Sequence, residues 1–202
     1  KDKFDDVEFE LSTAMKSTGE AMAIGRTFEE SLLKALRSSE YKPEADWDEL
    51  SDEELETDYL ERPTPDRPYA MFEAFERGFS VDEVVDLTNI YEWYVERYQN
   101  VAEAAEAAQD GDFDGAAEIG FTDGQIAAGV EASEASELPR ADGGDIDAVE
   151  ASTPDRSFKQ VDTCAGEFQA TTPYYYSARQ AAASKGQSRL TDEVQVDQDA
   201  ES

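Results

Sequence analysis

Neighbouring carboxylates are the groups in this sequence that most readily suggest metal chemistry. The pairs Glu29-Glu30 and Asp52-Glu53 have the charge for Mg²⁺, and Asp110, Asp112 and Asp114 alternate as in a calcium-binding loop. The pairs fall in predicted first helical turns, where acidic side chains favour the helix dipole. The aspartate series lacks the glutamate that a calcium loop carries at its twelfth position. We therefore expect solvated or helix-capping carboxylates, and no metal ligands.

Nucleophilic chemistry has even less support. Cys164 is the only cysteine, and the sequence contains no histidine. A Ser-His-Asp triad, a Cys-His pair and His-ligated zinc are therefore excluded within this chain, and the Cys164 thiolate has little local support. A buried structural thiol is the favoured interpretation, with a nucleophile as the alternative. No P-loop or glycine-rich hairpin is present, so we expect no catalytic or cofactor-binding residues.

The acidic charge is the strongest signal in the composition. Asp and Glu total 49 against 17 Lys and Arg, which gives a formal net charge of −32. Such a surface repels itself in dilute buffer, whereas in about 1 M salt the screening length falls to about 3 Å. This favours a salt-rich, halophilic cytoplasm over the alternative, a disordered acidic tail. The single cysteine suits a reducing compartment, and no apolar run reaches the length of a membrane span. A signal peptide is not recognisable, and the first residue, Lys1, suggests a fragment.

The start of the chain predicts one strand and one helix. Residues 21–24 are typical of a short buried strand, and Thr27 with Glu30 forms a capping box for a helix. The apolar residues of that helix recur on one face: Phe28, Leu32, Leu33 and Leu36. A lone strand leaves its backbone groups unpaired, so residues 1–39 are expected to be the strand-helix end of a larger domain.

Three further predicted helix starts share the same N-terminal sequence motif. Each has a capping box, formed by Ser51 with Glu54, Ser80 with Glu83, and Thr122 with Gln125. Each also has a hydrophobic staple around it, formed by Leu50 with Leu55, Phe79 with Val84, and Phe121 with Ile126. This repetition predicts short, well-terminated helices.

Two aromatic helices and a short one complete the predicted bundle. Thr64-Pro65 is expected to open a helix that ends at Gly78, and Thr88 to start the longest helix, which Gly111 stops. A shorter helix is predicted over residues 113–119. Apolar side chains recur on one side of the two longer helices: Tyr69, Phe72 and Phe75, then Ile90, Tyr94, Tyr98, Val101 and Ala105. Residues 132–154 are interpreted as an acidic, solvated loop. The fold class is therefore mainly α, a small helical bundle preceded by a βα stub.

A DNA-binding module is the alternative from another class. Residues 120–130 resemble the first half of a helix-turn-helix, which needs a recognition helix and phosphate-neutralising basic residues. Arg140 is the only basic residue between Val130 and Arg156. Such an acidic segment would repel DNA, so no nucleic-acid partner is expected.

Several motifs together resemble the large chain of carbamoyl-phosphate synthetase. Residues 15–27 resemble the end of its first ATP-grasp unit. The run at 158–168, continued by 172–177, is similar to the closing signature of the helical oligomerisation domain that follows. Weaker matches come between them in the same order: 63–67, 78–81, 87–90 and 120–123. The resemblance implies an ATP-grasp end at 1–39, an oligomerisation domain at 40–180, and an acidic linker toward the second synthetase unit at 181–202.

The resemblance also implies a context for this segment. The whole enzyme makes carbamoyl phosphate from bicarbonate, glutamine-derived ammonia and two ATP, with Mg or Mn, for arginine and pyrimidine synthesis. Its nucleotide sites belong to other parts of the large chain, and a small glutaminase subunit is a further partner. This segment would then be non-catalytic, linking the two ATP-grasp halves. A free-standing helical interaction module, or a small enzyme, is the alternative.

Two sets of residues are candidates for roles within that context. The stretch that contains Met22 lies, in this family, near the internal tunnel that passes a reactive intermediate, and ordinary strand packing is the alternative. Helical faces are candidates for contacts within a homo-oligomer, and core packing is the alternative for their aromatic residues. The candidate contact residues are Tyr69, Phe72, Phe75, Trp93 and Tyr94.

Overall fold

The computed structural model shows a mainly helical protein and describes residues 10–13, 20–136, 146–154, 156–164, 167–168 and 174–179. The α-helices in these parts are α1 (Phe28–Ser39), α2 (Asp52–Glu54), α3 (Arg67–Glu76), α4 (Val81–Thr88), α5 (Glu92–Gln109), α6 (Phe113–Ile119), α7 (Asp123–Ala128) and α8 (Ile146–Ser152). Two 3₁₀ turns, η1 (Trp47–Glu49) and η3 (Ala132–Glu134), and a π-helical stretch that continues α2, η2 (Leu55–Leu60), lie among them. Strands β1 (Arg156–Gln160) and β2 (Tyr175–Arg179) pair as an antiparallel hairpin.

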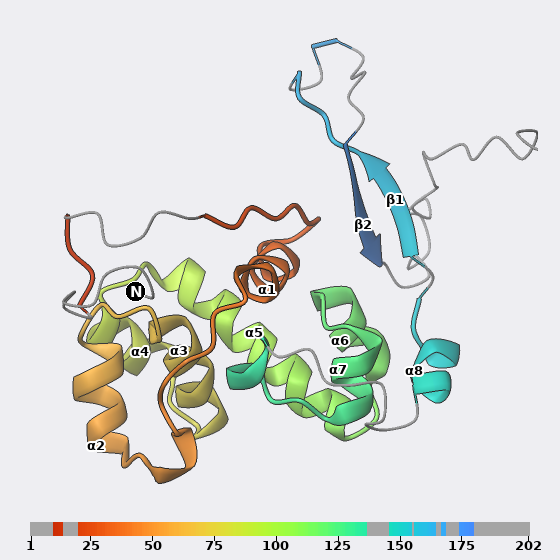
Figure 1. Ribbon diagram of the computed structural model, residues 1–202. Helices are drawn as coiled ribbons and strands as arrows, with labels where there is room; N and C mark the ends of the chain where they lie inside the picture. Colours follow the sequence, from red (N-terminus) through yellow and green to blue (C-terminus); the bar gives the residue numbers. More distant parts are fainter. Residues whose placement is uncertain are drawn as a thin grey trace, which may run out of the picture.

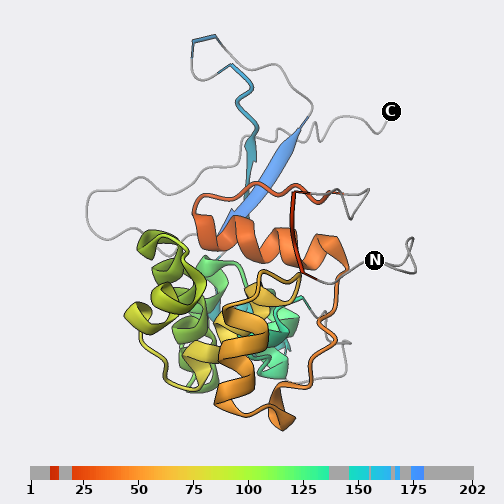
Figure 2. The ribbon, with the colours of Figure 1, turned by 90° about the vertical axis from the view of Figure 1, so that its left-hand side faces the viewer.

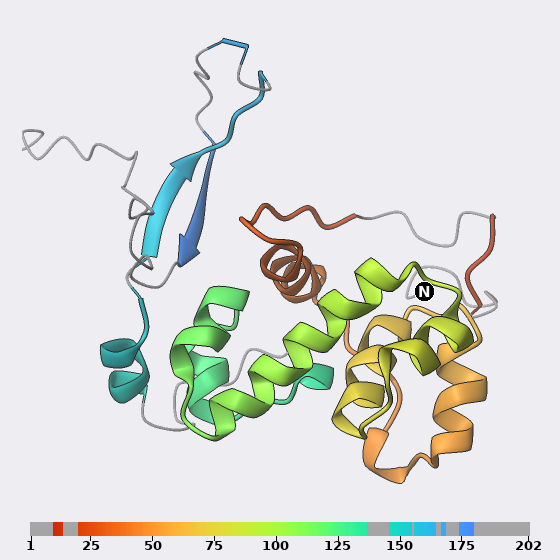
Figure 3. The ribbon, with the colours of Figure 1, turned by 180° about the vertical axis from the view of Figure 1, so that it is seen from behind.

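Helix α5 is the axis of the molecule (Figure 1). Helices α2, α3 and α4 gather around its N-terminal half, and α6 and α7 pack at its other end, as Figure 3 shows from behind. Helix α1 crosses above α5, and the hairpin projects beyond α1 on the side away from the other helices (Figure 2). The predicted class, mainly α, is confirmed.

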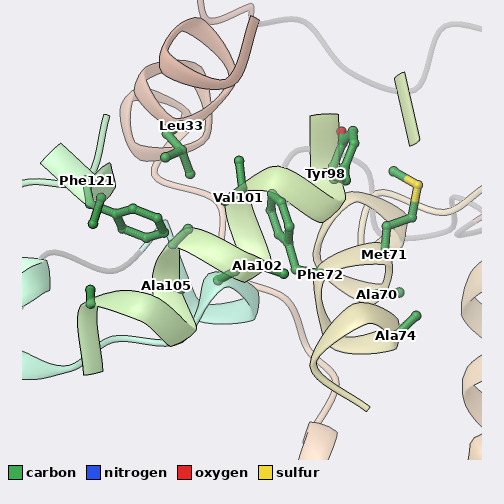
Figure 4. Close-up of a cluster of buried hydrophobic side chains, with 14 of the residues drawn as sticks. Leu33, Ala70, Met71, Phe72, Ala74, Tyr98, Val101, Ala102, Ala105 and Phe121 are labelled. Carbon is green, nitrogen blue, oxygen red and sulfur yellow. The ribbon is translucent and has the colours of Figure 1, made fainter. Parts of the chain in front are cut away.

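The core lies along one face of α5. Val95 and Val101 of this helix are fully buried. Figure 4 shows Leu33 from α1, Phe72 from α3 and Phe121 beside the α5 side chains Val101 and Ala105. Burying a side chain of the size of Phe72 contributes about 1.5–3 kcal/mol. Small residues in the second half of α5 and in α6 let these two helices approach closely: Ala102, Ala105, Ala108, Ala116 and Ala117, all buried.

The three repeated capping boxes form as predicted. In α2, α4 and α7 the N-cap hydroxyl accepts from the backbone of the third residue, whose side chain accepts from the N-cap backbone in return. Only one of the two hydrogen bonds of the capping box predicted at α1 forms. Thr27 Oγ1 accepts from the Glu30 N–H at 3.1 Å, but the Glu30 carboxylate accepts from the Arg26 N–H at 2.6 Å instead of from Thr27.

Two predicted helix starts are wrong. Thr88 ends α4 because its hydroxyl donates back to the Val84 carbonyl at 2.6 Å and Asn89 then adopts a left-handed φ of 55°, so α5 begins only at Glu92. Helix α3 begins at Arg67, not at Thr64, because the Arg67 N–H closes a turn on the Thr64 carbonyl at 3.2 Å.

The predicted strand at residues 21–24 has no ladder among the described residues, which form a single two-stranded sheet from β1 and β2. A strand needs a paired neighbour for its backbone groups, and nothing in the described part of the chain supplies one at this position. The helical half of the stub, α1, is present.

The solvated loop predicted over residues 132–154 is also wrong where the structure describes it. This segment contains η3 and α8, and Ala132, Ala135 and Val149 are buried. Gln125 Nε2 donates to the Ala135 carbonyl at 2.8 Å, and Glu76 Oε1 accepts from the Ala132 N–H at 2.6 Å. These contacts tie an acidic but locally ordered segment to α3 and α7.

No helix in the described part of the chain is long and apolar enough to span a bilayer.

Candidate interaction surface

Three exposed aromatic side chains stand together at the start of α5. Tyr91 is 83% exposed, Trp93 52% and Tyr94 43%. We call these three residues the aromatic patch. Large aromatic side chains are usually buried at least on one face, and a cluster of them on a surface is typical of an interaction site.

The aromatic patch rests on a continuous series of rings that leads into the core. Phe28, at the start of α1, contacts Trp93 and Tyr94 edge-on, with centroids 5.6 and 5.4 Å away. Phe28 also lies 6.4 Å from the Tyr98 ring, which in turn lies 4.9 Å from Phe72. Phe72 is fully buried, so Phe28 and Tyr98 connect the rings of Trp93 and Tyr94 to the core.

Polar contacts between α1 and α5 fix the same corner. Glu29 is buried, and its Oε1 accepts from Asn100 Nδ2 at 2.9 Å. Arg97 lies 3.7 Å from the same carboxylate, and its guanidinium carbon is 5.3 Å from the centre of the Trp93 ring. A cation above an indole face is attracted by the ring quadrupole. Arg97 therefore links the ion pair of the helix interface to the aromatic patch.

The other predicted contact residues lie elsewhere. Tyr69 is 1% exposed and Phe72 0%, so both belong to the core of this chain and leave no surface for a partner. Phe75 is half-buried and packs against that core. Met22 is 83% exposed in the extended segment before α1. Of the aromatic candidates, only Trp93 and Tyr94 lie together at the surface.

A second polar cluster, which the sequence did not suggest, anchors the hairpin. Asp123, in the first turn of α7, receives both guanidinium nitrogens of Arg179 from β2, at 2.5 and 2.7 Å. Arg156 of β1 is 3.7 Å from the same carboxylate, and the Thr153 hydroxyl accepts from Arg179 at 2.6 Å. Burial opposes the ionisation of Asp123, but the hydrogen bonds and charge of Arg179 outweigh it and lower the pKa of Asp123.

Lys34 makes a second bridge to the hairpin. Its ammonium donates to Glu30 Oε1 at 2.7 Å, to the Ile24 carbonyl at 3.0 Å and to the Ser177 carbonyl at 2.5 Å. Helix α1 is thereby joined to the extended segment before it and to β2. The only sequence signal for this role was the position of Lys34 one turn after Glu30, which predicts the ion pair but not the carbonyl contacts.

The carboxylates and the cysteine differ in part from expectation. Glu29 and Glu30 are 7% and 4% exposed, and are therefore not solvated. Asp112, from the weak calcium-loop pattern, caps α6 by accepting from the Gly115 N–H. Cys164 is half-buried and lies in a turn in which its N–H donates to Asp162, so the expectation of a buried thiol is wrong. A short turn outside the helical core offers it too little cover.

The helix-turn-helix alternative lacks its second element. Helix α7 spans six residues and is followed by the three-residue turn η3. The next described helix, α8, has seven residues and carries acidic side chains. The described segment after α7 therefore has no helix of recognition length to enter a major groove.

Comparisons with known proteins agree with this architecture. The family model described as "Carbamoyl-phosphate synthetase large chain, oligomerisation domain" matches residues 20–140. The carbamoyl phosphate synthase large chain of Halobacterium salinarum is 59% identical over 203 residues, which cover 100% of this chain and 18% of that protein. Proteins of the same name from Methanoregula boonei and Methanosarcina acetivorans are each 39% identical, over 89% and 87% of this chain and 16% of their own lengths.

The chain thus spans less than a fifth of the length of these relatives, 18% and 16%. Both kinds of match cover α1 to α7, the elements that build the core and carry the aromatic patch. This chain belongs to the carbamoyl-phosphate synthetase large chain family, and its residues 20–140 match the oligomerisation domain of that family.

Proposed function

We propose that this chain is the non-catalytic central segment of a carbamoyl-phosphate synthetase large chain and that it associates with a second copy of itself through the aromatic patch. The observation that carries the proposal is the exposure of Tyr91, Trp93 and Tyr94, of which Trp93 and Tyr94 pack on the Phe28 ring. Trp and Tyr side chains are enriched among the residues that supply most of the binding energy at protein interfaces.

The acidic surface sets the condition for such contact. A net charge of −32 makes two copies repel each other at low ionic strength. In about 1 M salt the screening length is about 3 Å, so the repulsion falls while apolar burial is retained. We therefore expect association to require salt, as in a halophilic protein.

The rest of the proposed protein supplies the chemistry. Residues 1–39 would end a first ATP-grasp unit, 40–180 form the oligomerisation domain, and 181–202 lead toward a second unit. That enzyme would make carbamoyl phosphate from bicarbonate, glutamine-derived ammonia and two ATP, with Mg or Mn held outside this segment. Its partners would include a small glutaminase subunit, and the single cysteine suits the cytoplasm as its compartment. Met22, exposed in this segment, would line the tunnel between the two sites.

Static light scattering from low to multimolar KCl tests the association. The chain should change from monomer to oligomer as salt rises, and Trp93→Ala should remain monomeric, because loss of a central aromatic anchor costs about 2 kcal/mol or more of binding energy. Tyr174→Ala, which removes a 67% exposed ring before β2, is the matched control and should associate normally. A monomer at every salt concentration, or association of Trp93→Ala equal to that of the control, would exclude the patch as the interface.

A further inference from the structure

A small basic cavity lies where α1, the α6–α7 corner and the hairpin meet, three parts that adjoin in Figure 1. Its volume is about 40 Å³. This space is open to water-sized probes, so the cavity has room for at least one small species. Four cationic side chains line it: Lys34, Arg37, Arg156 and Arg179.

Carboxylates do not balance these four cations. Glu30 is occupied by Lys34 at 2.7 Å, and Asp123 by Arg179 and Arg156. Arg37 donates to the Gln125 amide oxygen at 3.3 Å and has no carboxylate at ion-pair distance among the described residues. The cluster therefore holds an excess of two positive charges, in a chain whose overall charge is strongly negative.

Burial makes the charge of Arg37 costly, whereas the Arg156 side chain is 45% exposed. Desolvation, together with repulsion from Arg156, lowers the pKa of Arg37 to about 10, and the charge of Glu30 only partly offsets this. The Arg179 side chain is 10% exposed. Its Nε atom is buried and has no hydrogen-bond partner in the described part of the structure. An unpaired guanidinium N–H and an uncompensated charge beside the same cavity both require an acceptor of negative charge.

We propose that this cavity binds one small monovalent anion of the chloride type, held between Arg37, Arg156 and Arg179. The anion neutralises the excess charge and gives guanidinium N–H groups an acceptor. Because Arg37 lies on α1 and the other two arginines lie on β1 and β2, the bound anion also fastens the hairpin to the helical body.

Chloride-35 NMR of the purified full chain tests the site at constant ionic strength. Potassium chloride replaces potassium glutamate stepwise, and the excess chloride linewidth reports bound ion. We expect saturable broadening in the wild type and an affinity lower by about tenfold in Arg37→Gln, which is the loss of one charge-assisted hydrogen bond. Arg62→Gln removes an arginine of the same charge that is 52% exposed beside Glu10 and Asp58, and it should leave the affinity unchanged.

Several results would overturn the proposal. They are broadening that does not saturate, equal affinity in the two arginine variants, and displacement of chloride by stoichiometric phosphate. If Arg37→Gln does not fold, bromide-soaked crystals of the wild type decide the question through anomalous scattering. A bromide peak between the three arginines supports the site, whereas a cavity filled by water or by an acidic side chain refutes it.

Discussion

Asp123 has a structural role beyond the one that its position in the first turn of a helix suggests. It sits beside the N-cap of α7, and it also accepts both guanidinium nitrogens of Arg179, a residue 56 positions later. Asp123 is 13% exposed at its side chain. The hairpin, whose two strands pair only with each other in the described residues, depends on this attachment because a lone two-stranded hairpin is marginally stable in water.

Replacement of Asp123 by Asn should destabilise the protein by about 3 kcal/mol, because it leaves two partly buried arginines without their carboxylate. Urea unfolding followed by circular dichroism measures this loss. The wild type should also lose stability as the pH falls below about 4, the usual Asp value. The folded pKa is lowered, so the stabilisation is present above the unfolded pKa and disappears as the carboxylate is protonated.

The matched control is Asp112→Asn, in which the capping oxygen is retained on an exposed residue. This substitution should lower the free energy of unfolding only slightly. Equal losses in the two variants, or an Asp123→Asn protein as sensitive to acid as the wild type, would contradict the assigned role of Asp123.

At this scale, sequence reasoning succeeded where partners are close in the chain. The capping boxes at Ser51, Ser80 and Thr122 are contacts within three residues, so the residue types alone specify them. The bridge from Asp123 to Arg179 depends on where the hairpin folds back, which no local pattern encodes. The same reason explains Trp93: its type suggested a contact, but only the packing of Phe28 beneath it shows which face is exposed.

At the scale of elements, the close approach of α6 to α1 positions α1, which contributes to both the aromatic patch and the basic cavity. Gly120 ends α6 with φ of 118°, a backbone conformation that favours glycine. A Cβ atom placed there would lie 3.0 Å from the backbone Cα of Glu30. The contact between Gly120 and α1 therefore has room for a hydrogen atom but not for a Cβ atom. The next residue, Phe121, lines the basic cavity.

Gly120→Ala should cost about 2–4 kcal/mol, from backbone strain of about 1–2 kcal/mol and overpacking against α1. Gly78→Ala is the matched control, because Gly78 also has a positive φ, 89°, but no atom within 4 Å of the added Cβ. The Gly78→Ala protein should therefore lose only the stability that corresponds to the backbone strain. Thermal unfolding compares the two variants, and a Gly78→Ala protein as unstable as Gly120→Ala would show that the α1–α6 contact is loose.

Element types were easier to predict than element boundaries. The helix at residues 113–119 formed with the predicted limits, since Gly111 and Gly120 punctuate it on both sides with positive φ. The start of α5 was misplaced because Thr88 is a good N-cap by type, yet its hydroxyl bonds backward to Val84. Residues 21–24 have strand character, but a strand also needs a neighbour, and the sequence of one segment cannot provide it.

At the scale of the whole molecule, charge distribution separates the two proposed sites. The aromatic patch is a supported apolar surface on an acidic protein, and the basic cavity gathers four of the 17 Lys and Arg residues in one place. The composition predicted the acidic surface, and the apolar spacing with the capping boxes predicted the mainly helical fold. Neither predicted the cavity, because the four cations come from segments far apart in the chain.

We propose that this chain holds other domains of the enzyme in place and contains no reactive centre of its own. The most direct test of this proposal is ATP turnover by the purified chain with Mg²⁺ in multimolar KCl, after circular dichroism has verified its helical content. We predict a folded protein that releases phosphate no faster than the enzyme-free blank. Sustained ATP hydrolysis that increases with protein concentration and co-purifies with the chain would contradict it.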